Sequence, residues 1–434
     1  MTPEQVLALG PAFATYLRGF DECFVQERTR EHLRTYCRGL LSDLPRKSVE
    51  PIALAAGTAV RTLQEFLRDH AWDHERLRNL LQQRVARMPA PDPADDLGLG
   101  GILDETSVVK KGAKTPGVQR QWCGAVGKTE NCVVTVHLGV AWGRFKTLLD
   151  ADLYLPKSWD HDRARCAAAD IPPTVVYRPK WRIALEQLDR AAGNGVRLRW
   201  LTFDEGYGGK PDFLADLDDR EGLYYVGEVP RSFRCLTRRP RGRAPADGWK
   251  GKRADHLALF SPAFHRQDWQ GVQLARLTLD EQEWQVRAAQ VYLLRRGQLT
   301  ERTYWLIVAR NTATGEVKYL VSNAPADAAL GRLLRVGFAR WHVEHTFRVS
   351  KTEIGFGHFE GRSYVALLRH LLLCLLVMGF VSEQTERLRG EKPGTDAGAG
   401  VPGVEQPLRG VAGQPAGDIG VSAYVRGHCV SPAA

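Results

Sequence analysis

The chain has 434 residues, enough to bury a large core and to divide into two or more domains. Its 60 Lys and Arg against 50 Asp and Glu give a formal charge of +10 and a pI near 9.2. This excess of positive charge favours a polyanionic partner, although it does not identify one.

Cysteine usage and hydropathy indicate the cellular compartment of the protein. Eight cysteines, none in a C-x-x-C pair, indicate neither a disulfide framework nor a zinc site, which fits a reducing environment. The first residues carry no apolar signal core, and the longest apolar run, residues 371–381, is too short to span a bilayer. The sequence therefore predicts a cytoplasmic protein with no membrane partner.

Residues 1–95 are helical in pattern, with apolar positions three and four apart in residues 62–69 and 77–85. Basic residues are expected on the polar faces of these helices, which fits a domain that binds a polyanion. The alternative is a plain helical cap on the core. Residues 89–96 contain three prolines and predict a linker. The expected polar-face cations are Arg28, Arg30, Arg34, Arg38, Arg46, Lys47 and Arg61.

From residue 99 the pattern becomes strand-like and then alternates with a helix. Residues 102–104, 132–142 and 146–155 are rich in β-branched and aromatic residues or alternate in polarity, and they predict three strands. Residues 180–192 predict a helix that ends at Gly193-Asn194-Gly195, and residues 196–203 predict a fourth strand. The β-β-β-α-β order predicts a mixed α/β fold.

Two aspartates occupy comparable places in this pattern. Asp104 lies on the first predicted strand, and Asp204 directly follows the fourth. Each is followed by a glutamate, Glu105 or Glu205, which is a rival for the same role. Because consecutive side chains on a strand point to opposite faces, only one acid of each pair can face a shared site.

Residues 231–253 are strongly basic, with nine cations against a single acid, Asp247. Clustered guanidinium groups neutralise backbone phosphates and release counterions, so this segment predicts a DNA-phosphate contact. The alternative is an ordinary solvated basic loop, which would not need so large an excess. The nine cations are Arg231, Arg234, Arg238, Arg239, Arg241, Arg243, Lys250, Lys252 and Arg253.

Four more strands are predicted at residues 273–277, 285–294, 303–310 and 317–321, so residues 229–322 form a β-rich insertion. Residues 328–350 then predict a helix. On one helix, Arg340, Glu344 and Lys351 would lie within roughly 40° of one another. A carboxylate flanked by two cations suits a metal ion held beside a phosphate; the alternative is an exposed ion-pair ladder.

The end of the chain changes character twice. Residues 364–388 predict a largely apolar helix that packs in a core. From residue 390, ten glycines and five prolines fall in 45 residues, and this composition predicts disorder. The tail, residues 389–434, could also be a truncated or frame-shifted end.

The order Asp104, Asp204, Glu344 resembles that of the DDE transposases of bacterial insertion sequences, which have an RNase H-like catalytic core. The spacing Arg340-x3-Glu344-x6-Lys351 is similar to the YREK signature of the cut-and-paste branch of these enzymes. The resemblance runs from about residue 30 to about residue 385.

Other stretches carry the same resemblance in the same order, although Gly337 stands where the signature has its tyrosine. They are residues 103–106, 110–112, 121–124, 127–128, 131–132, 153–156 with Trp159, 319–323 and 355–360.

The resemblance implies a domain plan. Residues 1–95 would form the helical DNA-end-binding domain, and residues 99–228 the first part of the RNase H-like core. The β-rich insertion, residues 229–322, would separate the second and third acids, and residues 323–388 would complete the core. The family pattern also selects the aspartates over Glu105 and Glu205.

The resemblance further implies the chemistry. Asp104, Asp204 and Glu344 would be the catalytic residues and the ligands of two Mg²⁺ or Mn²⁺ ions, with Asp104 bridging both. Carboxylate oxygens are the hard ligands that these ions prefer. Arg340 and Lys351 would bind phosphates beside the scissile bond. The partners would be double-stranded DNA, both element inverted repeats and target, and paired-end cutting implies a dimer on DNA.

Two other functions use the same fold. One is a catalytically inactive or domesticated DNA-binding protein, which the intact acid triad disfavours. The other is an RNase H-like nuclease without strand transfer, which shares the triad and would differ in failing to join DNA ends to a target.

Overall fold

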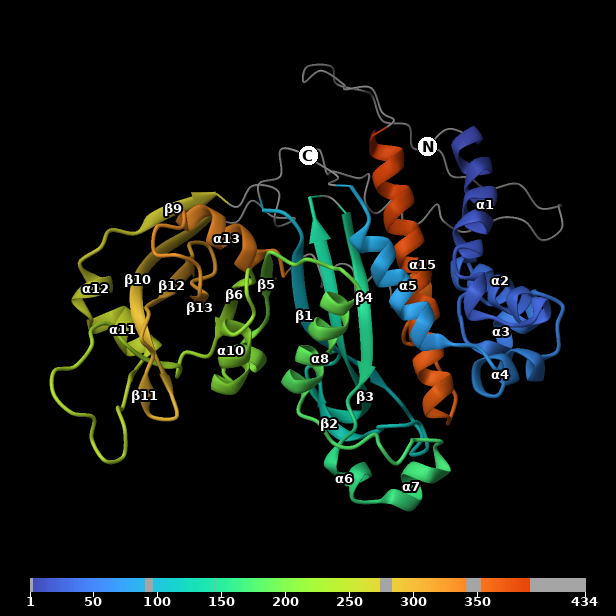
Figure 1. Ribbon diagram of the computed structural model, residues 1–434, viewed down its shortest axis with the longest axis horizontal. Coiled ribbons are helices and arrows are strands. Elements are labelled where there is room, and N and C mark those ends of the chain that lie inside the picture. Colours follow the sequence, from blue (N-terminus) through green and yellow to red (C-terminus); the bar gives the residue numbers. More distant parts are fainter. Residues whose placement is uncertain (1–2, 90–96, 144, 274–282, 341–352, 391–434) are drawn as a thin grey trace. The chain divides into compact units, whose positions relative to one another are not determined.

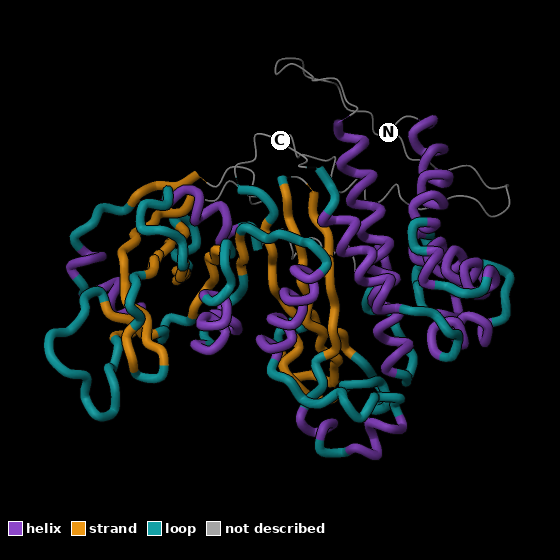
Figure 2. The backbone as a smooth tube through the Cα atoms, in the orientation of Figure 1, coloured by secondary structure: helices purple, strands orange, loops and turns teal. Residues whose placement is uncertain are grey.

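The computed structural model describes residues 3–89, 97–143, 145–273, 283–340 and 353–390 (Figure 1). The chain divides into two compact units. The helical unit comprises Met1–Leu81, Ala169–Ile171 and Arg348–Ala434, and the sheet unit comprises Gln82–Ala168 and Pro172–Phe347. Figure 2 shows this division, with the orange strands gathered in the sheet unit.

The helical pattern predicted for the N-terminal residues is confirmed. Residues 62–69 and 77–85 fall on α4 and α5, and Leu63, Phe66 and Leu77 are completely buried, as the three- and four-residue spacing requires. The elements are α1 (Pro3–Arg18), η1 (Asp21–Cys23), α2 (Glu27–Leu41), α3 (Val49–Ala55), α4 (Val60–Arg68), α5 (His74–Ala86) and α15 (Tyr364–Gly390).

The helix α15 is the core helix that the sequence predicted. It is long and apolar enough to cross a membrane, with a mean hydropathy of 2.2, but 94% of that apolar window is buried within the protein. Within the helical unit it contacts α2 and α4, and Phe380 lies 4.7 Å from Phe13 between ring centroids. Its apolar surface is therefore used in packing.

Not every cation expected on a polar face lies there. Lys47 is buried, and its Nζ donates to the carbonyl oxygens of Leu40, at 2.9 Å, and Glu353. That expectation was wrong for Lys47, because its ammonium group satisfies backbone carbonyls within the helical unit. Arg34 is half-buried, and its guanidinium donates to Glu27 at 2.7 Å.

The sheet unit contains a large mixed sheet with helices on its faces. Its strands are β1 (Gly100–Val109), β2 (Gln119–Cys123), β3 (Lys128–Trp142), β4 (Phe145–Leu153), β5 (Trp200–Thr202), β6 (Tyr224–Val229), β7 (Arg234–Leu236), β8 (Lys252–Arg253), β9 (Gln270–Gln273), β10 (Glu283–Arg295), β11 (Gln298–Leu299), β12 (Tyr304–Asn311) and β13 (Val317–Ser322). Its helices are α6 (Lys157–Asp160), α7 (Arg163–Ala168), α8 (Lys180–Gly193), α9 (Glu205–Gly208), α10 (Pro211–Asp218), α11 (Ala254–Phe260), α12 (Pro262–His265) and α13 (Leu330–Phe338).

The predicted β-β-β-α-β order is confirmed, with β2 as an additional strand. Strands β1, β3 and β4 are antiparallel neighbours, α8 follows, and β5 then pairs in parallel with β1. Strand β6 continues the sheet in parallel with β5. The fourth strand is shorter than predicted, three residues instead of eight, because only Trp200–Thr202 pair with β1.

The segment predicted as an insertion is rich in strands, and these extend the sheet. Strand β13 pairs with β6, β12 with β13, and β10 with β12, all antiparallel. The predicted strand at residues 273–277 falls on β9 only at its first residue, and residues 274–282 lie outside the described part of the chain.

Different helices pack on the two faces of the sheet, α8 on one and α13 on the other. Leu103 and Leu201 belong to the core cluster that contains Ile183 and Leu188 of α8. Val226 and Leu320 belong to a second cluster with α13 residues. On β1 and β5, odd-numbered residues such as Leu103 and Leu201 therefore face α8, and even-numbered residues face the opposite side.

Candidate active site

Asp104 on β1 and Asp204, two residues beyond the end of β5, lie at equivalent levels of two neighbouring parallel strands. Ile102 of β1 pairs with Thr202 of β5, and each aspartate lies two residues further along its strand direction. Since residues two apart point to the same face, both carboxylates belong to the even-numbered face of the sheet. The Thr202 hydroxyl on that face donates to the Gly337 carbonyl of α13 at 3.4 Å, which identifies it as the face that α13 covers.

The neighbouring glutamates lie elsewhere. Glu105 points to the opposite face, where its carboxylate accepts from Lys180 Nζ at the start of α8 at 2.6 Å. Glu205 is exposed in the first turn of α9. Strand alternation therefore separates Asp104 from Glu105, and the start of α9 separates Asp204 from Glu205.

The backbone of α9 holds the Asp204 side chain. Asp204 is the N-cap of this short helix, and its Oδ1 accepts from the backbone N–H groups of Gly206, at 2.9 Å, and Tyr207, at 3.3 Å. Its Oδ2 accepts no hydrogen bond from the described residues. A Cβ at Gly208 would lie 2.0 Å from the Glu228 carbonyl oxygen, so this turn needs glycine to lie against β6.

Asp104 is poorly neutralised for so buried an acid. Its side chain is 13% exposed, Oδ1 accepts from the Glu105 N–H at 2.7 Å, and Oδ2 lies 3.7 Å from Arg340 Nη1. Burial raises the pKa of Asp104 to about 7; the Arg340 guanidinium lowers that pKa less, and the Asp204 carboxylate raises it further. A second cation would relieve this electrostatic strain.

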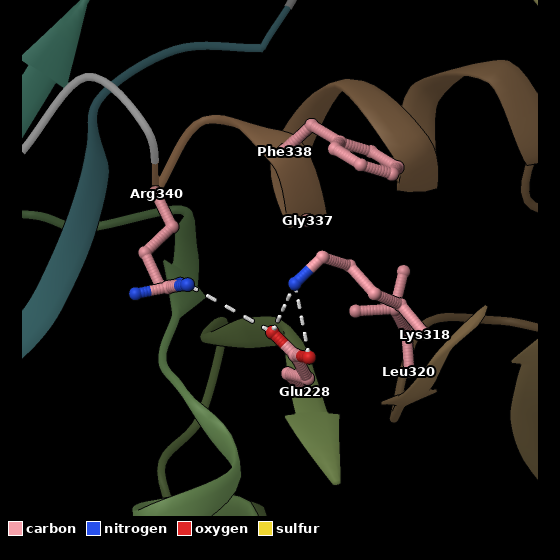
Figure 3. Close-up of a pocket in the computed structure, with 6 residues that line it drawn as sticks. All are labelled: Glu228, Lys318, Leu320, Gly337, Phe338 and Arg340. Atoms are coloured by element: carbon pink, nitrogen blue, oxygen red, sulfur yellow. Dashed lines mark hydrogen bonds and ion pairs between the residues drawn. The ribbon is translucent and has the colours of Figure 1, made fainter. Parts of the chain in front are cut away.

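Arg340 contacts a second acid that the sequence analysis did not single out. Figure 3 shows Glu228 of β6 between Arg340 and Lys318 of β13. Its oxygens lie 3.1 and 3.2 Å from Lys318 Nζ, and Oε2 lies 3.9 Å from Arg340 Nη2. The available signal was an acid within the apolar run of residues 223–229.

The predicted helix over residues 328–350 is confirmed for Leu330–Phe338 and stops short of Arg340. Helix α13 ends at Phe338, and Arg340 lies in the turn that follows. Glu344 and Lys351 lie outside the described residues, so the structure does not test their alignment with Arg340. Phe338 packs on Trp284 at 4.8 Å between ring centroids, which anchors the helix end while the Arg340 side chain extends to the acids.

Close packing restricts which side chain can stand at Gly337. A Cβ at Gly337 would lie 3.2 Å from a methyl carbon of Leu320 and 3.2 Å from one of Val226. A tyrosine side chain has no room there, because α13 lies directly on the sheet at this point.

The basic segment leaves strand β7 and returns on β8. Arg253 pairs with Asp255, Arg239 donates to the Thr300 carbonyl at 3.0 Å, and Arg234 donates to the Gly251 carbonyl at 2.8 Å. The remaining six cations of the segment are exposed: Arg231, Arg238, Arg241, Arg243, Lys250 and Lys252.

Among the described residues, no three His, Cys, Asp or Glu side chains gather as a metal site. Asp104 and Asp204 supply two carboxylates, and the predicted third ligand, Glu344, belongs to residues 341–352, which are not described. Glu353, which follows Glu344 by nine residues in the sequence, belongs to the helical unit. The carboxylate oxygens of the aspartate pair are hard donors that suit Mg²⁺ or Mn²⁺.

Comparison with known proteins identifies the family. Residues 19–293 match the family described as "DDE superfamily endonuclease". The chain belongs to this family. Its members have an RNase H-like core, in agreement with the strand order β4-β3-β1-β5-β6. The chain is also 28% identical, over 373 residues, to a protein of Microchaete diplosiphon named "Probable transposase for insertion sequence element IS701". This similarity covers 83% of the chain and 85% of that relative.

Proposed function

We propose that this DDE endonuclease is the transposase of an insertion sequence and that it acts by cut and paste. It would cleave DNA at the inverted repeats of its element and join the 3′ ends to target DNA. The observation that carries the proposal is that Asp104 on β1 and Asp204 just after β5 lie at equivalent levels of two parallel strands, on the face where Thr202 contacts α13. Family membership and the transposase named above support it.

The two aspartates and Glu344 would hold two divalent ions. Bound there, such ions would supply an activated nucleophile and neutralise charge on the attacking and leaving oxygens. Asp204 is suited to this because its Oδ1 is fixed by two backbone N–H groups while Oδ2 accepts none from the described residues. Asp104 is suited because its burial disfavours an isolated negative charge.

The cations would bind DNA. Arg340 lies within 4 Å of Asp104, which suits a contact with the phosphate beside the scissile bond, and Lys351 would contact the same backbone. Six exposed cations of the basic segment, Arg231, Arg238, Arg241, Arg243, Lys250 and Lys252, would contact phosphates further away. Residues 1–95 would bind the element ends, and cutting of paired ends would require at least a dimer on DNA.

The test is strand cleavage on a DNA fragment that carries the inverted repeat of the element. Glu344→Gln and Asp104→Asn remove charge while keeping size and hydrogen-bonding capacity. Both should still bind the fragment and should lose cleavage by several orders of magnitude, and to a similar extent, because residues of one metal site act as a unit. Glu205→Gln is the matched control, since that carboxylate is exposed, and it should cleave normally.

Metal and product analysis separate the alternatives. Cleavage should require Mg²⁺ or Mn²⁺ and fail with Ca²⁺, which binds the same oxygens in looser geometry. Specific binding without cleavage under any metal would identify an inactive DNA-binding protein. Cleavage without joining to a plasmid target would identify a nuclease.

A further inference from the structure

Two arginines share one indole ring where β10 and β12 run beside each other (Figure 1). Arg287 of β10 and Arg310 of β12 lie over Trp269, with their guanidinium carbons 4.4 and 4.3 Å from the ring centroid. Trp269 stands between α12 and β9. The two arginines are diagonal neighbours on one face of the sheet, because Gln285 pairs with Arg310 and Arg287 with Val308. Arg287, Trp269 and Arg310 are called the Trp269 stack below.

Neither guanidinium of the stack is neutralised by an acid among the described residues. Arg310 donates to Gln285 Oε1 at 2.7 Å, and the Nε of Arg287 is buried with no hydrogen-bond partner there. Asp268, which precedes Trp269, is exposed and forms no ion pair with either arginine. Both arginines are half-buried, so solvent screens their mutual repulsion only in part. The indole attracts both cations but has no net charge, so the stack keeps an excess positive charge that an anion would neutralise.

A second arginine stack on the same sheet shows how such a charge is neutralised within the fold. Arg302 lies over the Tyr304 ring at 4.9 Å, and its Nη2 donates to Asp218 at 2.7 Å. The same carboxylate accepts from the Tyr304 hydroxyl at 2.7 Å and pairs with Arg295. An acid of the chain completes that group. The Trp269 stack has two arginines and no such acid, so it suits an external anion.

The face that carries the Trp269 stack also lies near the basic segment, residues 231–253. Arg287 of β10 and Tyr319 of β13 flank the same residue of β12, so their side chains share this face. Burial and then Asp255 raise the pKa of Tyr319, and Arg231 lowers it, which places the Arg231 guanidinium near Tyr319. Arg231 is exposed. The stack and Arg231 therefore contribute to one positive region of the sheet unit.

This positive region lies on the face opposite to the aspartates. Tyr319 packs against the cluster that contains α8 residues, whereas Leu320 packs with α13. Asp104 and Thr202 lie on the α13 face. An anion at the stack is therefore separate from the scissile phosphate. Guanidinium groups suit a phosphate there, because their paired N–H donors match two phosphate oxygens.

We propose that Arg287 and Arg310, held over Trp269, bind the phosphate backbone of duplex DNA outside the active site. A phosphate supplies the negative charge that the stack lacks, and duplex DNA presents a row of phosphates to a positive face. The contact contributes affinity and not sequence preference, because phosphates carry no base information. This inference rests on the proposed function in taking DNA as the polyanionic partner.

Equilibrium binding of the full-length protein to two labelled duplexes tests the proposal, one with the inverted repeat and one of unrelated sequence. EDTA removes metal and cleavage from the measurement. The double variant Arg287→Gln, Arg310→Gln should bind both duplexes roughly tenfold more weakly at about 0.1 M salt, since one phosphate contact contributes about 0.9 log units there. The log–log slope of affinity against salt should also fall by about 0.9 for each phosphate lost.

Three further variants separate phosphate binding from a loss of net charge or of structure. Arg302→Gln is the matched control and should leave affinity and slope unchanged, because Arg302 is half-exposed but already paired with Asp218. Replacing both stack arginines with lysine keeps the charge without the planar guanidinium, so the slope should stay near that of the unmodified protein. Arg287→Gln alone should still lower the slope, and it serves if the double glutamine variant fails to fold in a thermal melt.

Each outcome bears on the proposal. Binding by the unmodified protein, with unchanged affinity and slope in the double glutamine variant, would overturn this inference alone. An equal loss with glutamine and with lysine would also overturn it, because the arginines would then support the fold and not supply charge. A loss confined to the inverted-repeat duplex would assign them to base recognition, against the proposal. Failure of the unmodified protein to bind either duplex would overturn the proposed function and this inference together.

Discussion

The sheet unit carries two pairs of aspartates that differ in how completely they are neutralised. Asp150 and Asp152 of β4 lie under α8, where Arg190 pairs with both, Nε being 2.9 Å from Asp150. Gln82 Nε2 also donates to Asp150 at 2.9 Å, and Gln187 Nε2 to Asp152 at 3.4 Å. The pair Asp104 and Asp204 faces the other side of the sheet.

That second pair has fewer partners. Its contacts with described residues are backbone N–H groups and Arg340, which lies 3.7 Å from Asp104. Buried acids cost free energy unless charge and hydrogen bonds compensate them, and the β4 pair is compensated within the fold. The comparison teaches that acid content and burial do not separate the two pairs, whereas incomplete neutralisation singles out the pair that we propose as metal ligands.

The largest expected effect breaks the functional pair. Asp204→Asn keeps a good N-cap for α9, since asparagine caps helices as well as aspartate does. Thermal stability should therefore change little, while metal-dependent strand cleavage should fall by about 10⁴-fold or more. The check is a cleavage time course beside a melting curve. A large drop in stability would mean that the Asp204 charge serves the fold.

The opposite result is expected for the compensated pair. Arg190→Met leaves two buried carboxylates without their cation and should lower the free energy of unfolding by about 3–5 kcal/mol. Urea denaturation measures this, and protein that remains folded should still cleave. The control is Arg182→Met on the same helix, whose half-exposed side chain lies 3.5 Å from its nearer acid, Asp216, and should cost under about 1 kcal/mol.

Sequence patterns among adjacent residues predicted the positions of the two aspartates, but they did not predict Glu228 and Lys318. Strand alternation and the Gly193-Asn194-Gly195 helix end are encoded by adjacent residues, so the β-β-β-α-β order and the places of Asp104 and Asp204 followed from the sequence. Glu228 and Lys318 are 90 residues apart and meet only because β13 pairs with β6. No local pattern specifies that pairing.

The same limit explains two other differences. The end of α13 at Phe338 depends on packing against Trp284, which is more than fifty residues away in sequence. The roles of Asp150 and Asp152 depend on Arg190 and Gln82, which reach them from other elements. Which residues of other elements contact an acid is determined by the tertiary fold, and these contacts decide whether the acid is neutralised.

A smaller effect should appear in the pH dependence of the metal-free protein. The folded-state pKa of Asp104, about 7, lies above the ordinary value of 3.8. Protonated Asp104 therefore favours folding; this contribution is complete below about pH 3.8 and is lost as pH rises through about 7. Relative to the unmodified protein, Asp104→Asn should gain on the order of 4 kcal/mol between pH 4 and pH 8.

Denaturation in EDTA across this range measures the difference. Since the Asp204 charge contributes to raising the Asp104 pKa, the decline should be smaller and should end at a lower pH in Asp204→Asn. A difference between Asp104→Asn and the unmodified protein that does not vary with pH would show that Asp104 does not titrate in this range.

The smallest effect extends the comparison from acids to cations. Replacing Arg231, Arg238, Arg241 and Arg243 with alanine should weaken DNA binding and flatten its salt dependence, because these arginines are exposed. The log–log slope of affinity against salt should decrease by about 0.9 for every phosphate that the variant no longer neutralises. Arg253→Ala is the control, since that guanidinium is already paired with Asp255 and should leave the slope nearly unchanged. An equal slope for the fourfold variant and the unmodified protein would reduce the basic segment to a solvated loop.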